Sequence, residues 1–236
     1  MPDDPRALDA LLEDRGGVWW SAFFTDRARD SANPCPFLVD WPDESLVAWF
    51  AQGLLAPGRV LELGCGNGRN AVHLASLGCT VDAVDFSERA VEWTLQRARS
   101  AGAAVAVQCC SIFDATFSTR SYDLVYDSGC FHHLPPHRRE GYVDLVDRAL
   151  KPDGSYGLVC FRPEGGSGYT DQQVYERASL GGGLGYSEER LRALWDGAPF
   201  RLRELRQMRK TDGQEQEPSF GEDFLWVLLA TKEGPA

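Results

Sequence analysis

Hydrophobic and polar positions divide the middle of the chain into alternating blocks. Short apolar runs of the strand type lie at 60–63, 79–85, 103–110, 122–127 and 155–161. Most segments between them are long enough for a helix, and the first carries apolar residues at the helical spacing of Ala71, Leu74 and Ala75. Strands separated by helix-length segments predict an α/β fold with a Rossmann-like, doubly wound and mostly parallel sheet.

Two further apolar runs near the end of the chain, 200–208 and 223–231, have only a polar loop between them. This spacing allows an antiparallel hairpin and no crossover helix, so we expect a seven-stranded sheet whose last strand is antiparallel. The basic residues at 201–210 alternate with apolar ones on the first of these runs. We interpret them as the solvated edge of the sheet.

The segment before the fifth strand predicts a helix that follows Pro135 and Pro136. Its apolar face is made of Tyr142, Leu145, Val146, Ala149 and Leu150. The Lys-Pro-Asp-Gly sequence at 151–154 then predicts a turn. We therefore expect the strand to begin after this turn.

The first 55 residues differ in composition from the rest of the chain. They are rich in proline, tryptophan and phenylalanine, as in VWWSAFF at 18–24 and WPDESLVAWF at 41–50. We interpret 1–55 as an aromatic-rich lid over the substrate and 56–236 as the main domain, the two forming one compact unit. The glycine-rich loops at 163–168 and 179–186 are expected to be mobile and to help cover the carboxyl edge of the sheet, where ligands of such folds bind.

Composition excludes several classes of function. The chain has 236 residues and a net charge of −11, which opposes binding to nucleic acid. Its seven cysteines show no metal-ligand spacing, so we expect neither a metal site nor a disulfide framework. The acidic start of the chain lacks the features of a signal peptide, and the apolar run at 224–230 is too short to span a membrane. We expect a cytoplasmic protein without a membrane partner.

The segment VLELGCGNGRN at 60–70 joins the first strand to a helix through three alternate glycines. Such a loop lets a ligand approach the backbone. Its third glycine, Gly68, comes one residue too early for the G-x-G-x-x-G loop that binds a dinucleotide pyrophosphate. Asp85 ends the second strand, where a carboxylate can accept hydrogen bonds from a ribose. These features favour a nucleoside cofactor without phosphates over a nicotinamide cofactor.

Four blocks of sequence, in order, resemble the class I S-adenosylmethionine-dependent methyltransferases. They are ELGCGNGRNA, Asp85, YDLVYDSGCFHHL and RALKPDGSYGLVCF, and they cover residues 60–161. More loosely, the aromatic N-terminal segment and GEDFLWVLLATK look like the thiopurine and thiol methyltransferases, which act on small molecules. The resemblance implies S-adenosyl-L-methionine as the cofactor, S-adenosyl-L-homocysteine as the product and a small molecule as the methyl acceptor.

The resemblance also implies which residues hold the methionine and ribose parts of the cofactor. The bare backbone of Gly64, Cys65 and Gly66 would pass under the methionine part. Glu62 would help to place its amino group, and Asp85 would hold the ribose hydroxyls.

The adenine, by the same resemblance, would lie between Phe86 on one side and Ile112 and Phe113 on the other. Ser111 stands where the family often has an aspartate that accepts a hydrogen bond from the adenine amino group, and an aspartate, Asp114, comes only later, so this contact is open. Trp20 is a candidate for contact with the sulfonium, because aromatic rings attract cations. The alternative for the aromatic residues at 19–24 is the core of an added helix.

The candidate catalytic residues are Asp127, at the end of the fourth strand, and His132, which follows it. Alcohols and many phenols need a base before they can accept a methyl group, whereas a thiol hardly does. His132 is either that base or a residue that lines the pocket. The resemblance implies that Asp127 faces the methyl end of the cofactor. His133, Phe24 and Tyr169 are further candidates for contact with the acceptor.

Other readings stay open beside a small-molecule methyltransferase. The chain could instead modify a protein, or bind S-adenosylmethionine without catalysis. Arg69, in the first turn of the helix after the glycine loop, could meet the carboxylate of the cofactor, but we expect it to face solvent.

Overall fold

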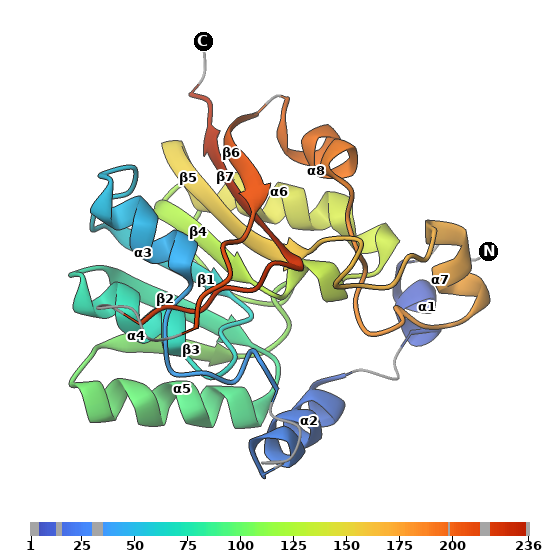
Figure 1. Ribbon diagram of the computed structural model, residues 1–236, viewed down its shortest axis with the longest axis horizontal. Helices are drawn as coiled ribbons and strands as arrows, with labels where there is room; N and C mark the ends of the chain where they lie inside the picture. The colour runs from blue at the N-terminus through green and yellow to red at the C-terminus, as the bar shows by residue number, and fades with distance from the viewer. Residues whose placement is uncertain (1–4, 13–15, 30–34, 198, 213–217, 235–236) are drawn as a thin grey trace.

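A computed structural model describes residues 5–12, 16–29, 35–197, 199–212 and 218–234. A seven-stranded sheet with the order β3-β2-β1-β4-β5-β7-β6 forms its centre (Figure 1). The strands are β1 (Arg59–Leu63), β2 (Thr80–Asp85), β3 (Val105–Cys109), β4 (Tyr122–Ser128), β5 (Leu150–Phe161), β6 (Phe200–Gln207) and β7 (Leu225–Lys232).

The pairing of the strands confirms the predicted topology. Strands β1 to β5 pair in parallel, and β7 pairs antiparallel with both β5 and β6. The basic run lies on β6, at the edge of the sheet, as expected. The carboxyl ends of the parallel strands point to one side of the molecule, so the loops that follow β1, β2 and β4 come together there.

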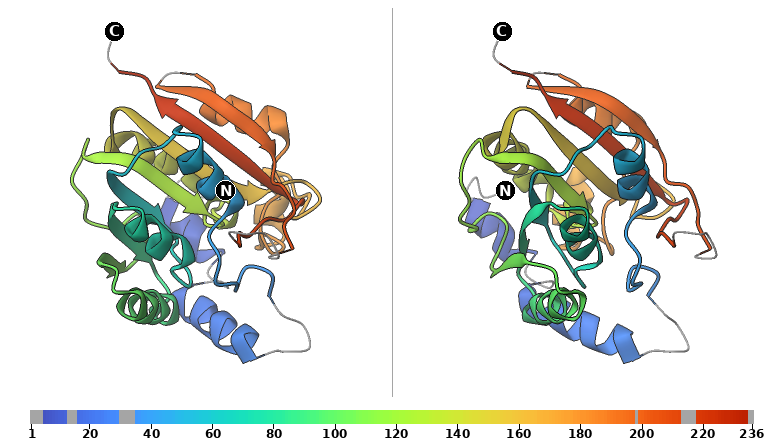
Figure 2. Two further views of the ribbon diagram at one scale, coloured as in Figure 1. Left: turned by 60° about the vertical axis from the view of Figure 1, so that its left-hand side comes forward. Right: turned by 90° about the vertical axis from the view of Figure 1, so that its left-hand side faces the viewer.

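Helices cover both faces of the sheet (Figures 1 and 2). One face carries α3 (Glu44–Ala51), α4 (Arg69–Ser76) and α5 (Glu88–Ala101), and the other carries α6 (Arg139–Ala149) and α8 (Glu188–Trp195). Ser87 caps α5 as expected, since its Oγ accepts from the backbone N–H of Ala90 at 3.2 Å. Of the helices that the structure describes, none combines the length and apolarity needed to cross a bilayer.

Strand β5 shows how the alternation of side chains fills both cores. Tyr156 and Leu158 belong to the core under α6 and α8, whereas Val159 belongs to the core under α3 and α4. A Cβ on Gly157 would come within 2.9 Å of Trp49 and 2.8 Å of Tyr126. The missing side chain at position 157 is therefore what lets α3 pack its tryptophan against the sheet.

Strand β5 also begins earlier than predicted. Leu150, expected on the face of the preceding helix, instead pairs with Tyr122 of β4, and the ladder is irregular before it resumes at Ser155. Asp153 within this stretch has a φ of +62°. The Lys-Pro-Asp-Gly sequence makes a turn-like irregularity inside the strand instead of a break before it.

The N-terminal segment has two parts with different surroundings. Helix α3 carries Leu46 and Trp49 into the core of the sheet. Helices α1 (Pro5–Ala10) and α2 (Gly17–Arg29) lie on the side to which the parallel strands point (Figure 1). The carboxylate of Asp9 on α1 accepts from Arg138 Nε at 3.0 Å and contacts His137 Nε2 at 2.8 Å.

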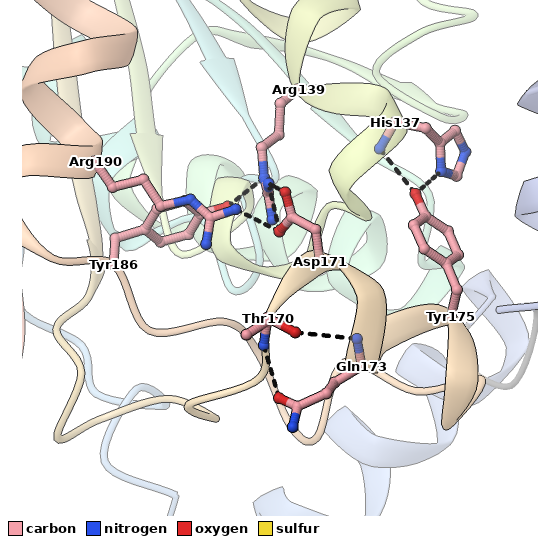
Figure 3. Close-up of polar contacts among 8 residues, drawn as sticks. All are labelled: His137, Arg139, Thr170, Asp171, Gln173, Tyr175, Tyr186 and Arg190. Atoms are coloured by element: carbon pink, nitrogen blue, oxygen red, sulfur yellow. Dashed lines mark hydrogen bonds and ion pairs between the residues drawn. The ribbon is translucent and has the colours of Figure 1, made fainter.

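The two glycine-rich loops, expected to be mobile, are hydrogen-bonded to each other. Ser167 N donates to Gly183 O at 2.7 Å, and Gly185 N donates to Ser167 O at 3.0 Å. Between the loops lies α7 (Asp171–Glu176), which a capping box of Thr170 and Gln173 begins (Figure 3).

Helix α7 is fixed to its neighbours by ion pairs. Asp171, its first residue, pairs with Arg139 of α6 at 2.8 Å and also with Arg190 of α8 (Figure 3). These contacts set the position of the loop at 179–186 that follows α7.

Candidate functional site

A cavity of about 630 Å³ opens where the parallel strands end. Its walls come from α1, α2 and the loops that follow β1 to β5, and its volume suits a drug-sized ligand, for which pockets of roughly 300–1,000 Å³ are usual. Most of the residues predicted for the site line it: Trp20, Phe24, Glu62, Gly64, Cys65, Gly66, Asp85, Phe86, Ser111, Ile112, Phe113, His132 and His133. Asp127 and Tyr169 do not belong to this lining.

The glycine loop brings bare backbone to the cavity. A Cβ on Gly64 would lie 2.7 Å from Cβ of Cys130, so this position has no room for a side chain. Gly66 differs, because a Cβ there would meet no atom within 4 Å. Its φ of +55° nevertheless favours glycine, and the space beside it belongs to the cavity.

Asp85 is held at the rim of this loop by two backbone N–H groups. Its Oδ2 accepts from Gly66 N and its Oδ1 from Ser87 N, each at 2.9 Å. Burial raises the pKa of this carboxyl, and the two N–H groups oppose that shift. Each carboxylate oxygen has a second lone pair, so the side chain can accept further hydrogen bonds from a ligand.

Glu62 is the residue of the site whose environment is most unusual. It lies 2% exposed on β1, and its Oε2 has no hydrogen-bond partner among the described residues. Burial raises its pKa to about 8, an effect that the positive charge of Arg69 opposes. A buried oxygen without a donor at the wall of a cavity is expected where a ligand supplies the donor.

The loops after β2 and β3 make a second wall. Phe86 is 41% exposed, and Ile112 belongs to the same lining. Ser111 Oγ accepts from the backbone N–H of Phe113 at 3.3 Å, so this hydroxyl holds the turn at 111–113.

Helix α2 contributes an aromatic wall. The ring of Trp20 lies 5.8 Å from that of Phe24 and 4.6 Å from that of His133, measured between centroids. The hydroxyl of Ser21 lies 2.9 Å from that of Ser87, which attaches α2 to the start of α5.

Arg69 is buried, so the expectation that it faces solvent is wrong. It is 7% exposed, and its guanidinium pairs with Asp43 at 2.7 Å and donates to Ser128 Oγ at 3.2 Å. The same Asp43 carboxylate accepts from Asn70 Nδ2 at 3.0 Å and Tyr126 Oη at 2.6 Å. This network ties the segment before α3 to α4 and β4 and fixes one wall of the cavity.

Asp127 lies beneath the cavity and not in its wall, unlike the expectation that it faces the methyl end of a cofactor. Its Oδ1 accepts from the backbone N–H groups of Cys130 at 2.8 Å and Phe131 at 3.3 Å, and its Oδ2 accepts from Tyr142 Oη at 2.5 Å. Burial raises its pKa to about 7, and these hydrogen bonds limit the rise. Its carboxylate is thus turned toward the backbone of the next turn, whose position it fixes.

That turn, the 3₁₀ helix η2 (Phe131–His133), places both histidines in the wall. His132 is 2% exposed, stacks on Phe161 with centroids 3.7 Å apart, and accepts at Nδ1 from the backbone N–H of Phe161 at 3.3 Å. Burial lowers its pKa well below the ordinary value, and His133 adds to this effect.

Tyr169 packs among the glycine-rich loops and not in the cavity wall. The guanidinium of Arg177 lies 4.9 Å from the centre of its ring, and a Cβ on Gly181 would touch it at 2.8 Å. The loop at 179–186 instead contributes Leu180 and Gly182 to the lining.

An aromatic cluster beyond His132 was not identified from the sequence. The ring of Phe37 lies 6.0 Å from those of Phe161 and Phe220, and all three residues line the cavity. They come from three distant parts of the chain. Only their aromatic character could have marked them as candidates, and many core residues share it.

Comparisons with known proteins identify the family of the chain. A family model described as a methyltransferase domain matches residues 60–154. An uncharacterized methyltransferase of Schizosaccharomyces pombe (strain 972) is 32% identical over 121 residues, which cover 51% of this chain and 83% of that protein. The 2-heptyl-1-hydroxyquinolin-4(1H)-one methyltransferase of Mycobacteroides abscessus is 28% identical over 152 residues, 64% of this chain and 66% of that protein.

Among solved structures, the fold is similar to that of the Burkholderia thailandensis 1,6-didemethyltoxoflavin-N1-methyltransferase with bound 1,6-didemethyltoxoflavin and S-adenosylhomocysteine. The TM-score is 0.69 at 20% sequence identity, and the match covers 99% of this chain and 92% of that one.

Proposed function

The chain belongs to the class I S-adenosylmethionine-dependent methyltransferases, and we propose that it transfers a methyl group to the O, N or S atom of a small molecule. One observation carries the proposal. The glycine loop, Glu62, Asp85 and His132 line a single cavity at the carboxyl ends of the parallel strands. A cofactor held by the first three would have its reactive end inside the same enclosure as the histidine.

The residues present fit S-adenosylmethionine. The Oε2 of Glu62, which has no hydrogen-bond partner in the described part of the chain, would accept from the cationic amino group of the methionine part. Asp85 keeps lone pairs for the ribose hydroxyls. The bare backbone at Gly66 leaves room for the part of the cofactor between its methionine and its ribose. Phe86 and Ile112 would lie against the adenine.

The bound cofactor supplies a methyl group on a positively charged sulfur, which is already electrophilic. The protein therefore has to orient the acceptor for in-line attack and to keep water out. The aromatic side chains of α2 and the loop at 179–186 surround the cavity and suit both tasks.

A small molecule is the acceptor that the observations favour. The cavity has the volume of a small-molecule site, and the net charge of −11 opposes a nucleic acid. The Mycobacteroides abscessus relative is itself named for a small aromatic substrate. The looser resemblance to the thiopurine and thiol methyltransferases stays a prediction.

The test combines binding with transfer. We expect S-adenosylhomocysteine to bind in calorimetry and labelled S-adenosylmethionine to pass its methyl group to the small-molecule fraction of a cell extract. Asp85→Ala should abolish both signals. Asp144→Ala, an exposed carboxylate on α6 outside the cavity lining, is the matched control and should change neither.

The other outcomes separate the alternatives. Label in the protein fraction would favour a protein-modifying enzyme. Binding without any transfer would favour a protein that binds the cofactor without catalysis. No binding would contradict the assignment of the site.

A further inference from the structure

Part of the cavity lining is an apolar cluster next to His132, linked by ring contacts. We call it the acceptor end: His132, Phe37, Val159, Phe161, Phe220 and Leu225. Phe161 lies at its centre, with its ring against His132 and 6.0 Å from that of Phe37. None of these side chains carries a carboxylate or an amine. Arg69, the nearest cation described on the lining, is already paired with Asp43.

The hydrogen bond at Nδ1 decides what His132 can do. A neutral imidazole has one nitrogen that accepts and one that donates. Since Nδ1 accepts from the backbone N–H of Phe161, the proton of the ring lies on Nε2. His132 therefore presents an N–H donor, and not a free lone pair, at its outer nitrogen.

A histidine that acts as a base through Nε2 requires the opposite arrangement. Its Nδ1–H must donate to a carboxylate or carbonyl, which stabilises the imidazolium after proton transfer. The nearby carboxylate, Asp127, is instead occupied by Cys130, Phe131 and Tyr142.

The other groups around the ring do not help it to accept a proton. His133 on the same turn disfavours a positive charge on His132. Phe161 on β5 has no titratable group. Gly183, where an added Cβ would lie 3.0 Å from the ring of His132, has no side chain. Burial also disfavours the imidazolium.

We propose that the acceptor is a small aromatic molecule whose nucleophilic atom is unprotonated in water before it binds, and that His132 donates its Nε2–H to an acceptor atom of that molecule. This inference rests on the proposed function. Aromatic thiols, acidic phenols or N-hydroxy heterocycles, and heteroaromatic nitrogens meet the requirement. Alcohols and ordinary phenols, which need a base, do not.

The reaction balances without a proton acceptor in the protein. The nucleophile contributes the electron pair of its new bond to the methyl carbon. The carbon–sulfur bond breaks, and its electron pair stays on sulfur as the neutral thioether. An anionic acceptor gives a neutral product, and a neutral ring nitrogen takes over the positive charge of the sulfur, so in neither case does a proton have to leave.

The test uses acceptors that differ only in acidity: a series of ring-substituted thiophenols and the matching phenols. We expect the thiophenols to be methylated, with kcat/KM falling about tenfold per pH unit below the pKa of each acceptor. The break in the pH profile should move with the acceptor.

Two variants of His132 separate a donor from a base. His132→Asn keeps an oxygen near the place of Nδ1, where it can accept from Phe161 N, but loses the outer donor. His132→Gln places an amide N–H near the position of Nε2. We expect His132→Asn to raise KM for the acceptor roughly 3- to 10-fold, as for loss of one hydrogen bond. His132→Gln should have a KM much closer to that of the wild type. Neither variant should move the pH break.

Three results would overturn the inference. One is a break in the wild-type pH profile at the same pH for all acceptors, which disappears in both His132 variants while their turnover is slowed by about 100-fold or more, as for loss of a base. Another is efficient methylation of the un-ionised phenols at neutral pH. The third is no transfer to any thiophenol while S-adenosylhomocysteine still binds. Failure of that binding would contradict the proposed function itself.

Discussion

At the scale of single residues, Asp127 shows how a side chain can support a site that it does not line. Its carboxylate accepts from the N–H groups of Cys130 and Phe131 and from the hydroxyl of Tyr142. Asp127→Ala would leave the two buried backbone N–H groups without an acceptor and the hydroxyl of Tyr142 with Tyr156 as its one remaining partner. We expect a loss of about 2–4 kcal/mol in the free energy of unfolding, equivalent to a melting temperature lower by roughly 5–15 °C.

Asp127→Asn is the informative partner of that variant. The amide oxygen can still accept from both backbone groups, and the amide NH₂ can donate to the hydroxyl of Tyr142. We expect a stability cost of at most about 1 kcal/mol and a turnover rate close to that of the wild type. Thermal melts and transfer assays on both variants check this. A well-folded Asn variant whose turnover is slowed about 100-fold would show that the charge itself takes part in the reaction.

At the scale of elements, α2 is the part of the N-terminal segment whose role as a lid is open to test. The ring of Trp20 contacts His133 and its own neighbours on the helix, and it lies outside both core clusters of the sheet. We expect Trp20→Ala to weaken cofactor binding roughly 3- to 10-fold through loss of cation–π and apolar contact. The melting temperature should change by no more than about 2 °C.

Calorimetry and melting curves check this, with Val18→Ala as the control. Val18 lies on the same helix and is 88% exposed, so its truncation should alter neither quantity. A large fall in melting temperature for Trp20→Ala with unchanged affinity would show that these rings form the core of an added helix.

Helix α7 is expected to act on the acceptor through the loop that follows it. Asp171 joins α7 to Arg139 and Arg190, and Arg139 is 6% exposed. Asp171→Asn would leave a buried guanidinium without its counter-charge. Because Asp171 itself is about half exposed, we expect a modest stability loss of about 1–2 kcal/mol.

The kinetic result should distinguish this loop from the cofactor site. We expect Asp171→Asn to raise KM for the acceptor and to leave S-adenosylhomocysteine affinity unchanged, because Leu180 and Gly182 line the cavity from this loop. Glu176→Gln, at the exposed end of the same helix, is the control. A change in cofactor affinity without a change in KM would contradict this division.

Elements with strong local patterns could be predicted, and those that depend on distant partners could not. The glycine spacing and the acidic end of β2 indicated the residues at the glycine loop and Asp85 from local sequence alone. Arg69 looked like a surface residue because its partner, Asp43, comes before β1 in the sequence, whereas Arg69 comes after it. The apolar face of α3 does have helical spacing at Leu46 and Trp49, but its aromatic content favoured a cover instead.

The orientation of the side chains at the site could not be predicted from the sequence either. Nothing in the order of residues says that the backbone of Phe161 donates to His132, or that Asp127 turns toward the backbone that follows it. Both facts depend on how β4, β5 and η2 meet in space. The sequence could therefore indicate that these residues belong to or lie next to the site, and could not assign their roles.

At the scale of the whole molecule, the buried carboxyl of Glu62 couples the stability of the fold to pH. Its pKa is raised to about 8 in the folded protein from an ordinary value near 4.5. The folded state thus holds a proton that the unfolded state has already lost. This contribution to stability is fully present below about pH 4.5, decreases as the pH rises through 8, and is absent above it. Asp127, with a pKa raised to about 7, acts in the same direction.

Replacing Glu62 with a neutral isostere should therefore raise the stability of the fold at high pH and weaken cofactor binding. We expect Glu62→Gln to match the wild type in melting temperature near pH 4 and to exceed it by several degrees at pH 9, because the amide has no charge to bury. The same variant should bind S-adenosylhomocysteine at least tenfold more weakly, since it lacks the anion that would face the amino group. Melting curves from pH 4 to 9, without and with ligand, measure both effects. Equal stability of the two proteins at pH 9 would mean that Glu62 is not buried as a charge, and unchanged affinity would remove it from the cofactor site.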